Sequence, residues 1–321
     1  MHFKPDWDDA CEYYVAWWEG RSLGRVTLAA AAPRPADVPP PPEPPGDSQT
    51  RWTDPDFRIS QAEYRFATTY FGGEAFPYFD TNVGPGSLAL FLGCPVWFSP
   101  DTVWYEPIAS TPQELPELKF DGENEWWLTS RRLVEQGMER GRGRYLVSQP
   151  DLIENLDIIA SLLGTSGMLY GLKDDPEGTK KLLDQINDLY FSYYDDLFDN
   201  VLDGEQLGSC FSAFQIWSPG KVAKIQCDAA AMLSPEDFAE FFVPAASDQT
   251  ARLTNSAYHL DGPDAVCHID ELVKIPDLNA IQWTPGIGQP TPGDETWWPM
   301  YRKVLDGGKG LLLLGTEFDD V

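Results

Sequence analysis

Residues 256–272, "SAYHLDGPDAVCHIDEL", join a short apolar strand pattern to a helical pattern. Successive side chains of a strand point to opposite faces, so His259 and Asp261 are expected to share one face. Gly262 and Pro263 interrupt the strand pattern, as these residue types commonly do. The apolar residues that follow recur at helical spacing. The stretch therefore predicts one strand followed directly by one helix.

The same succession of strand and helix recurs along the chain. Apolar runs such as "RYLVSQPD" and "KIQCDAA" precede helical patterns such as "LIENLDIIASLLG" and "SPEDFAEFFVPAA", and Ser234 and Asp264 are the expected helix caps. Near-continuous apolar strands alternating with helices are typical of a parallel sheet covered by helices. The number of units favours a TIM-type (β/α)8 barrel over an open doubly wound sheet. No G-x-G-x-x-G motif follows the first strand, which argues against dinucleotide binding.

The N-terminal part departs from this alternation. Residues 6–20 predict a short amphipathic helix, and "GRVTLAAAAP" (24–33) predicts a buried strand. The prolines within residues 33–50 cannot donate backbone hydrogen bonds, so this Pro-rich segment is expected to be an extended, solvated loop. We therefore divide the chain into residues 1–59, with the N-terminal helix, first strand and Pro-rich insertion, and residues 60–321, the barrel, within a single domain overall.

Composition excludes several classes of partner. The 321 residues include 51 acidic and 23 basic side chains, a formal net charge of −28, which repels nucleic acid and anionic membrane surfaces. No apolar run approaches the ~20 residues that a membrane-spanning helix needs. The five cysteines are scattered without a CxxC pair, which argues against a disulfide framework. These features predict a soluble, cytoplasmic protein that acts on a small molecule.

Polar residues at the predicted carboxyl ends of strands are the candidates for a site, because barrel enzymes carry their catalytic groups there. Asp80, Asp228 and His259 are predicted to be catalytic. Six further residues are predicted to bind substrate: Asn82, Gln149, Gln226, Tyr258, Gln282 and Trp283. His259 and Asp261 are predicted to bind one metal ion from their shared face. We expect residues 80, 228, 259 and 261 to converge on one central cavity.

Three other features predict packing rather than chemistry. Cys267 and His268 are expected on the partly buried surface of a helix, and Cys227 is expected to be a small buried residue. The arginines of "RRLVEQGMERGRGRY" precede a strand, so they are expected to lie away from the site and to form ion pairs with acidic residues.

Several ordered segments resemble the uroporphyrinogen decarboxylase superfamily, which includes corrinoid- and coenzyme M-type methyltransferases. The resemblance covers about residues 60–315 and is carried by "FDTNVGPGSLALFLG", "QPDLIENLDIIASLLGTSGMLYGLKDDPE", "IQCDAAAMLSPEDFAEFFVP", "YHLDG", "IQWTPG" and "GKGLLLLG". It implies the same barrel. Matching the strands to the family gives seven core units, with "CFSAFQIW" as an accessory strand beside "KIQCDAA". The last βα unit is therefore predicted to be absent from this chain.

The resemblance carries functional residues over only in part. The decarboxylases hold substrate carboxylates with arginines of an early "RQAGRY" segment, which this chain lacks. Asp80 resembles their aspartate that accepts hydrogen bonds from pyrrole N–H groups. The methyltransferases bind zinc through His-x-Cys and a distant cysteine. His259 matches that histidine, but Asp261 stands in the cysteine's place, so zinc or a harder divalent ion is implied.

Three functions follow from the resemblance. The first is a metal-assisted methyltransferase that takes its methyl group from a corrinoid or related tetrapyrrole, with a corrinoid carrier protein as a possible partner. The second is a decarboxylase-like lyase that acts without a cofactor on a pyrrolic carboxylic acid bound by Asp80. The third is a non-catalytic binding barrel that has lost the chemistry of the family.

Overall fold

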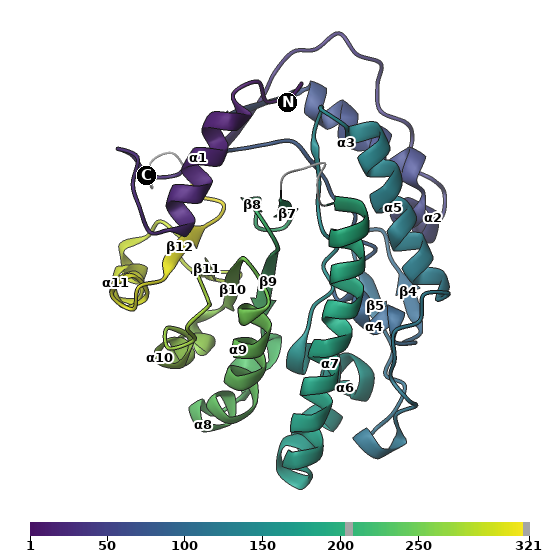
Figure 1. Ribbon diagram of the computed structural model, residues 1–321, viewed down its shortest axis with the longest axis vertical. Coiled ribbons are helices and arrows are strands. Elements are labelled where there is room, and N and C mark those ends of the chain that lie inside the picture. Colours follow the sequence, from purple (N-terminus) through teal and green to yellow (C-terminus); the bar gives the residue numbers. More distant parts are fainter. Residues whose placement is uncertain (203–207, 317–321) are drawn as a thin grey trace. The chain divides into compact units, whose positions relative to one another are not determined.

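The computed structural model describes residues 1–202 and 208–316 (Figure 1). Contacts between Cα atoms divide the chain into two compact units. Unit 1 comprises Met1–Glu106, Leu118–Leu152 and Leu189–Lys221, and unit 2 comprises Pro107–Glu117, Ile153–Asp188 and Val222–Val321. The boundary predicted at residue 59 stays a prediction.

The sheet of unit 2 is parallel and has four strands. These are β9 (Val222–Gln226), β10 (Asn255–Asp261), β11 (Ala280–Thr284) and β12 (Gly310–Leu313), in the order β12-β11-β10-β9. Nearly all residues of β9, β10 and β11 are buried. Burial of both faces of a strand is the expected state of a parallel sheet that helices cover.

Helical segments precede and connect the strands of unit 2. They are α6 (Asn155–Asp174), η3 (Asp228–Met232), α8 (Pro235–Asp237), η4 (Phe238–Phe242), α9 (Val243–Ala251), η5 (Pro263–His268), α10 (Ile269–Leu272), η6 (Glu295–Trp297) and α11 (Trp298–Asp306), preceded by η1 (Pro112–Glu114). Helix α7 (Pro176–Leu197) follows α6 along the chain. The Ser234 side chain accepts a hydrogen bond from the Asp237 N–H at 3.1 Å, which confirms the predicted N-cap of α8.

Unit 1 contains short strand pairs and several helices. Its strands are β1 (Ala29–Pro33), β2 (Thr69–Gly73), β3 (Tyr78–Phe79), β4 (Val96–Phe98), β5 (Val103–Tyr105), β6 (Leu146–Val147), β7 (Ser209–Phe211) and β8 (Ile216–Ser218). Its helices are α1 (Trp7–Trp18), α2 (Ser48–Thr53), α3 (Pro55–Ala67), α4 (Ser87–Phe91), α5 (Glu125–Gly141) and η2 (Phe198–Leu202). Strands β3 and β6 pair in parallel, whereas β1-β2, β4-β5 and β7-β8 are antiparallel.

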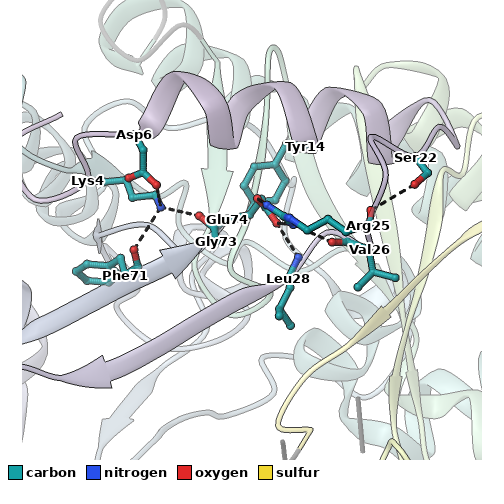
Figure 2. A network of polar contacts seen from close by, with 10 residues as sticks. All are labelled: Lys4, Asp6, Tyr14, Ser22, Arg25, Val26, Leu28, Phe71, Gly73 and Glu74. Carbon is teal, nitrogen blue, oxygen red and sulfur yellow. Dashed lines mark hydrogen bonds and ion pairs between the residues drawn. The ribbon is translucent and has the colours of Figure 1, made fainter.

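A polar network attaches the N-terminal segment to β2 (Figure 2). The ammonium group of Lys4, which is 1% exposed, donates to the carbonyl oxygens of Gly73 (2.6 Å) and Phe71 (3.3 Å). The buried Glu74 carboxylate accepts two hydrogen bonds from Arg25, at 2.6 and 2.8 Å, and a third from the Leu28 N–H at 2.7 Å. Because every charge in it has a partner, this network stabilises the fold rather than offering a site.

Several expectations about the elements are confirmed. The helix predicted over residues 6–20 is α1, and the strands predicted in "KIQCDAA" and "SAYHLDG" are β9 and β10. The Pro-rich segment has no regular structure before α2 begins at Ser48. All five cysteines are free in the structure.

Three local predictions are wrong. The strand predicted as buried in residues 24–33 is β1, which is exposed at each of its five residues and pairs antiparallel with β2. "CFSAFQIW" is not one strand but the hairpin β7-β8, turned at Gln215 with a φ of 53°. Asp264 lies inside η5, whose cap is Gly262 without a side-chain hydrogen bond. In the described residues the strand pairs do not join into one continuous sheet, so a closed barrel stays a prediction.

Candidate functional site

The carboxyl ends of three parallel strands bring predicted site residues into one row. Gln226 of β9, His259 of β10 and Gln282 of β11 are register partners. Register partners in neighbouring strands present their side chains to the same face of the sheet. The two glutamines are buried and His259 between them is half-buried. The structure therefore places a histidine between two amides at the edge where a catalytic group is expected.

One hydrogen bond determines which nitrogen of His259 carries the proton. The side-chain nitrogen of Gln282 donates to the Trp283 carbonyl at 2.7 Å and to the Thr284 hydroxyl at 2.9 Å, and this orients the amide oxygen toward Nδ1 of His259. Because a carbonyl oxygen only accepts, Nδ1 is the donor. In the neutral ring the lone pair is then on Nε2, the atom that can accept a proton or bind a metal ion.

A buried carboxyl group lies beside this row. Asp157, in the first turn of α6, accepts a hydrogen bond from the Gln226 side chain at 2.8 Å. Both of its oxygens also accept from the Asp228 N–H, at 2.9 and 3.0 Å. The pKa of Asp157 is raised to about 7, mainly by burial and to a smaller extent by the neighbouring negative charge of Asp228. Asp157 is therefore a group that can hold or release a proton near neutral pH.

Further charged residues surround the end of β9. Asp228, predicted to be catalytic, is exposed at the start of η3 and holds Asp157 through its backbone N–H. The buried Glu154 carboxylate accepts from the Gln226 N–H at 2.8 Å. Lys224 is buried two residues before Gln226 on the same face, and its positive charge partly offsets the rise in the pKa of Asp157. The end of β9 is thus a charged, partly buried environment.

Sequence patterns missed three of these residues. Period-two alternation from Gln226 back to Lys224 is a signal that places both on one face of β9. Asp157 and Glu154 carry a weaker signal, since acidic residues are common at helix starts for reasons unrelated to chemistry. Only the packing of α6 beside β9 shows that they meet Gln226.

Two residues predicted to bind substrate lie on the opposite face of the sheet. Tyr258 and Trp283 each neighbour a residue of the His259 row and therefore point away from it. Tyr258 is 1% exposed and packs its ring against Phe242, with the ring centroids 5.5 Å apart. Trp283 is fully buried, with its ring centroid 4.9 Å from that of Trp297. Both side chains therefore have a packing role on the other face of the sheet, and their predicted contact with substrate stays a prediction.

The described residues do not provide a complete metal site. Asp261 is exposed, two residues beyond His259 on the same strand. Within residues 1–202 and 208–316, no group of three or more His, Cys, Asp or Glu side chains could hold a metal ion. A catalytic zinc ion usually has three protein ligands. The donor set formed by His259 and Asp261 therefore does not fit such an ion.

The predicted site residues of unit 1 follow the parallel pair β3-β6. The Asp80 carboxylate accepts from the Asn82 N–H at 3.0 Å and from the Ser212 hydroxyl at 3.3 Å. The Asn82 side-chain oxygen accepts from the Asp151 N–H. Asn82 therefore ties two backbone turns together, which is a positioning role. Its predicted contact with substrate stays a prediction.

Gln149 carries a buried amide without a partner. The residue is 1% exposed, and neither the oxygen nor the nitrogen of its side chain has a hydrogen-bond partner among the described residues. Leaving a buried amide unsatisfied costs on the order of 1–3 kcal/mol. Such a group is expected where a ligand or an ordered water supplies the missing hydrogen bonds.

The predicted convergence of Asp80 with Asp228, His259 and Asp261 on one cavity concerns residues of two different units, and it stays a prediction.

The remaining sequence-based expectations have clear outcomes. His268 is fully buried rather than at the helix surface, stacked on Phe238 with ring centroids 4.1 Å apart, so that prediction is wrong. Cys227 is buried as expected, and burial raises the pKa of its thiol well above the ordinary value. The expected ion pairs are confirmed for Arg131, Arg140 and Arg144, for example Arg140 and Arg144 with Glu63 at 2.7 and 2.5 Å.

Comparison with known proteins gives a likeness at the level of the fold. No family model matches the sequence, and no curated protein matches it. A solved structure, a methyltransferase from Methanosarcina mazei, superimposes with a TM-score of 0.57 at 13% sequence identity, covering 97% of this chain and 95% of that chain. The mixed α/β fold with parallel strands is therefore shared with a methyltransferase.

Every helix within the described residues is too short or too polar to cross a lipid bilayer.

Proposed function

We propose that this chain is a methyltransferase-like enzyme of the uroporphyrinogen decarboxylase superfamily, built on a barrel, whose reaction takes place at His259. The observation that carries the proposal is the row Gln226, His259 and Gln282, in which the amide oxygen of Gln282 meets Nδ1 of His259; from this contact we infer that the lone pair of the neutral ring is on Nε2. The likeness in fold to a methyltransferase supports the reaction class. The resemblance of "YHLDG" to the strand end of the superfamily supports the position of the site.

The proposed reaction moves one proton and one methyl group. His259 Nε2 accepts the proton of the acceptor substrate, such as a thiol, as its nucleophilic atom attacks the methyl carbon. The electron pair of the broken methyl bond stays with the leaving group of the donor. Gln282 keeps Nδ1 protonated and orients the ring. Asp157 holds a second proton next to Gln226 near neutral pH.

The methyl donor that we propose is a corrinoid or related tetrapyrrole, free or on a carrier protein. A corrinoid supplies a methyl group that a deprotonated nucleophile can remove. Because the two donors His259 and Asp261 fall short of a protein-held zinc site, no step is assigned to a metal ion. The predicted divalent ion is tested separately, by the metal content of the wild-type protein and of His259→Ala after incubation with zinc.

Methyl transfer from methylcobalamin to small thiols tests the function directly. The wild-type protein should accelerate the loss of methylcobalamin absorbance, and His259→Gln should lower the rate roughly 10²–10⁴-fold. His2→Gln is the matched control, because His2 is an exposed histidine in the other unit, and it should retain the wild-type rate. Equal rates for wild type and His259→Gln would refute the assignment of His259.

A second function is favoured by the unpartnered amide of Gln149. A decarboxylase-like lyase needs hydrogen-bonding groups for an N–H-bearing carboxylic acid, and Asp80 and Gln149 provide an acceptor and an unsatisfied amide. Release of carbon dioxide from pyrrolic acids, lost in Asp80→Asn and retained in His259→Gln, would select this function over methyl transfer. Binding of these acids without either reaction would identify a non-catalytic binding protein.

A further inference from the structure

A cavity of about 570 Å³ lies in unit 1 between the Pro-rich segment and helices α2 and α3. Its charged lining consists of Arg51, Arg58, Arg65 and Asp80, so three positive charges accompany one negative charge. The chain as a whole has a formal net charge of −28, which makes this local excess of positive charge unusual. The volume falls within the range of small-molecule sites, about 300–1,000 Å³.

The three arginines differ in how many of their guanidinium N–H donors already form hydrogen bonds within the protein. Arg58 donates to the backbone carbonyls of Trp52 at 2.9 Å, of Asp80 at 2.6 Å and of Asn82 at 2.5 Å, so it organises the wall of the cavity. Arg65 donates to one carbonyl oxygen, that of Tyr78, at 3.0 Å. No described residue accepts a hydrogen bond from the guanidinium of Arg51. Arg51 and Arg65 therefore keep donors for a guest.

Aromatic side chains form part of the cavity wall, and hydrogen bonds fix two places in it. Trp52, Phe57, Tyr64 and Phe79 belong to its lining. The Trp52 indole N–H donates to the Ser99 carbonyl at 2.8 Å, which holds its ring in place. The Gln61 amide donates to the carbonyl oxygen of Pro42 at 2.7 Å and attaches the Pro-rich segment to α3. An aromatic surface next to unoccupied guanidinium donors suits a flat ring that carries an anion.

We propose that this cavity is a binding site for a small molecule in which a carboxylate or phosphate is attached to an aromatic ring. Arg51 and Arg65 hold the anionic group, and the lining rings contact the apolar body. The Asp80 carboxylate does not cancel the attraction, because its single negative charge is outnumbered by the three guanidinium groups of the lining, and it already accepts from Asn82 and Ser212. This proposal is independent of the methyl transfer assigned to His259, and it gives the Pro-rich segment a function as one wall of a site.

Calorimetric titration with three naphthalene compounds that differ only in the substituent at position 2 tests the proposal. The probes are 2-naphthoate, 2-naphthyl phosphate and the neutral 2-naphthol. At least one of the two anions should bind the wild-type protein at least tenfold more tightly than 2-naphthol does, and the stronger anion identifies the preferred group. Equal affinity for 2-naphthol would show a merely apolar groove and would overturn the proposal, as would the failure of both anions to bind.

A single substitution locates the binding. Arg51→Gln should weaken binding of the anion roughly tenfold, or ~1.4 kcal/mol, without altering the affinity for 2-naphthol. Since Arg51 donates to no described residue, its replacement should leave the urea midpoint of unfolding unchanged. Arg302→Gln is the matched control, because Arg302 is exposed in unit 2 and also donates to no described residue. An unchanged affinity in Arg51→Gln, or an equal loss in Arg302→Gln, would contradict the assignment.

Discussion

The buried carboxyl group of Asp157 should make the stability of the protein fall as the pH rises. Its pKa is raised from 3.8 to about 7, and a rise of about three pH units corresponds to ~4 kcal/mol. Between pH 4 and 7 the folded protein binds a proton at Asp157 that the unfolded chain has lost. The free energy of unfolding therefore decreases across this window and levels off above it. About 3 kcal/mol of the decrease should develop between pH 5 and pH 8.

Urea denaturation of Asp157→Asn isolates this effect. Asparagine has no proton to lose, so its stability relative to the wild type should improve by about 3 kcal/mol between pH 5 and pH 8. The variant still loses an acceptor for the Asp228 N–H, but that loss is present at both pH values and cancels in the difference. Asp264→Asn, an exposed site, serves as the control. A relative stability that changes by less than about 1 kcal/mol would refute the reasoning, because the carboxyl group would then titrate alike in both states.

Two further predictions concern the packing of unit 1. Glu74→Gln should lower the free energy of unfolding by about 2 kcal/mol, because the 2% exposed carboxylate accepts from Arg25 and a backbone N–H; a loss below about 0.5 kcal/mol in urea denaturation would contradict this. Gly137→Ala should cost about 1–3 kcal/mol by overpacking, since the added Cβ would lie 2.6 Å from Phe79. Gly46→Ala, with nothing within 4 Å, should be neutral, and equal thermal midpoints for the two alanine variants would argue against overpacking.

The elements of the parallel sheet could be predicted from apolar runs that end in polar residues. The same runs indicated that Gln226, His259 and Gln282 lie at strand ends, and the register places them in one row. Period-two alternation also excludes Tyr258 and Trp283 from that row. Their predicted contact with substrate would therefore have to come from the opposite face of the sheet, and it stays a prediction.

Other features depend on tertiary contacts that no local pattern encodes. The alanines of β1 look like a buried strand, but their small side chains are compatible with an exposed strand that pairs only with β2. The turn of the β7-β8 hairpin has Gln215 at a positive φ, where glycine or asparagine would have signalled the turn. Asp157 acquires its raised pKa only when α6 packs beside β9.

The position of the proton on the His259 ring tests the central claim most directly. Long-range ¹H–¹⁵N NMR of the neutral ring, assigned by its loss in His259→Gln, should show the proton on Nδ1 and the lone pair on Nε2, because Gln282 offers Nδ1 a carbonyl oxygen. In Gln282→Leu this preference should disappear. A proton found on Nε2 in the wild-type protein would contradict the account, since the histidine could then neither accept a proton there nor act as the base of methyl transfer.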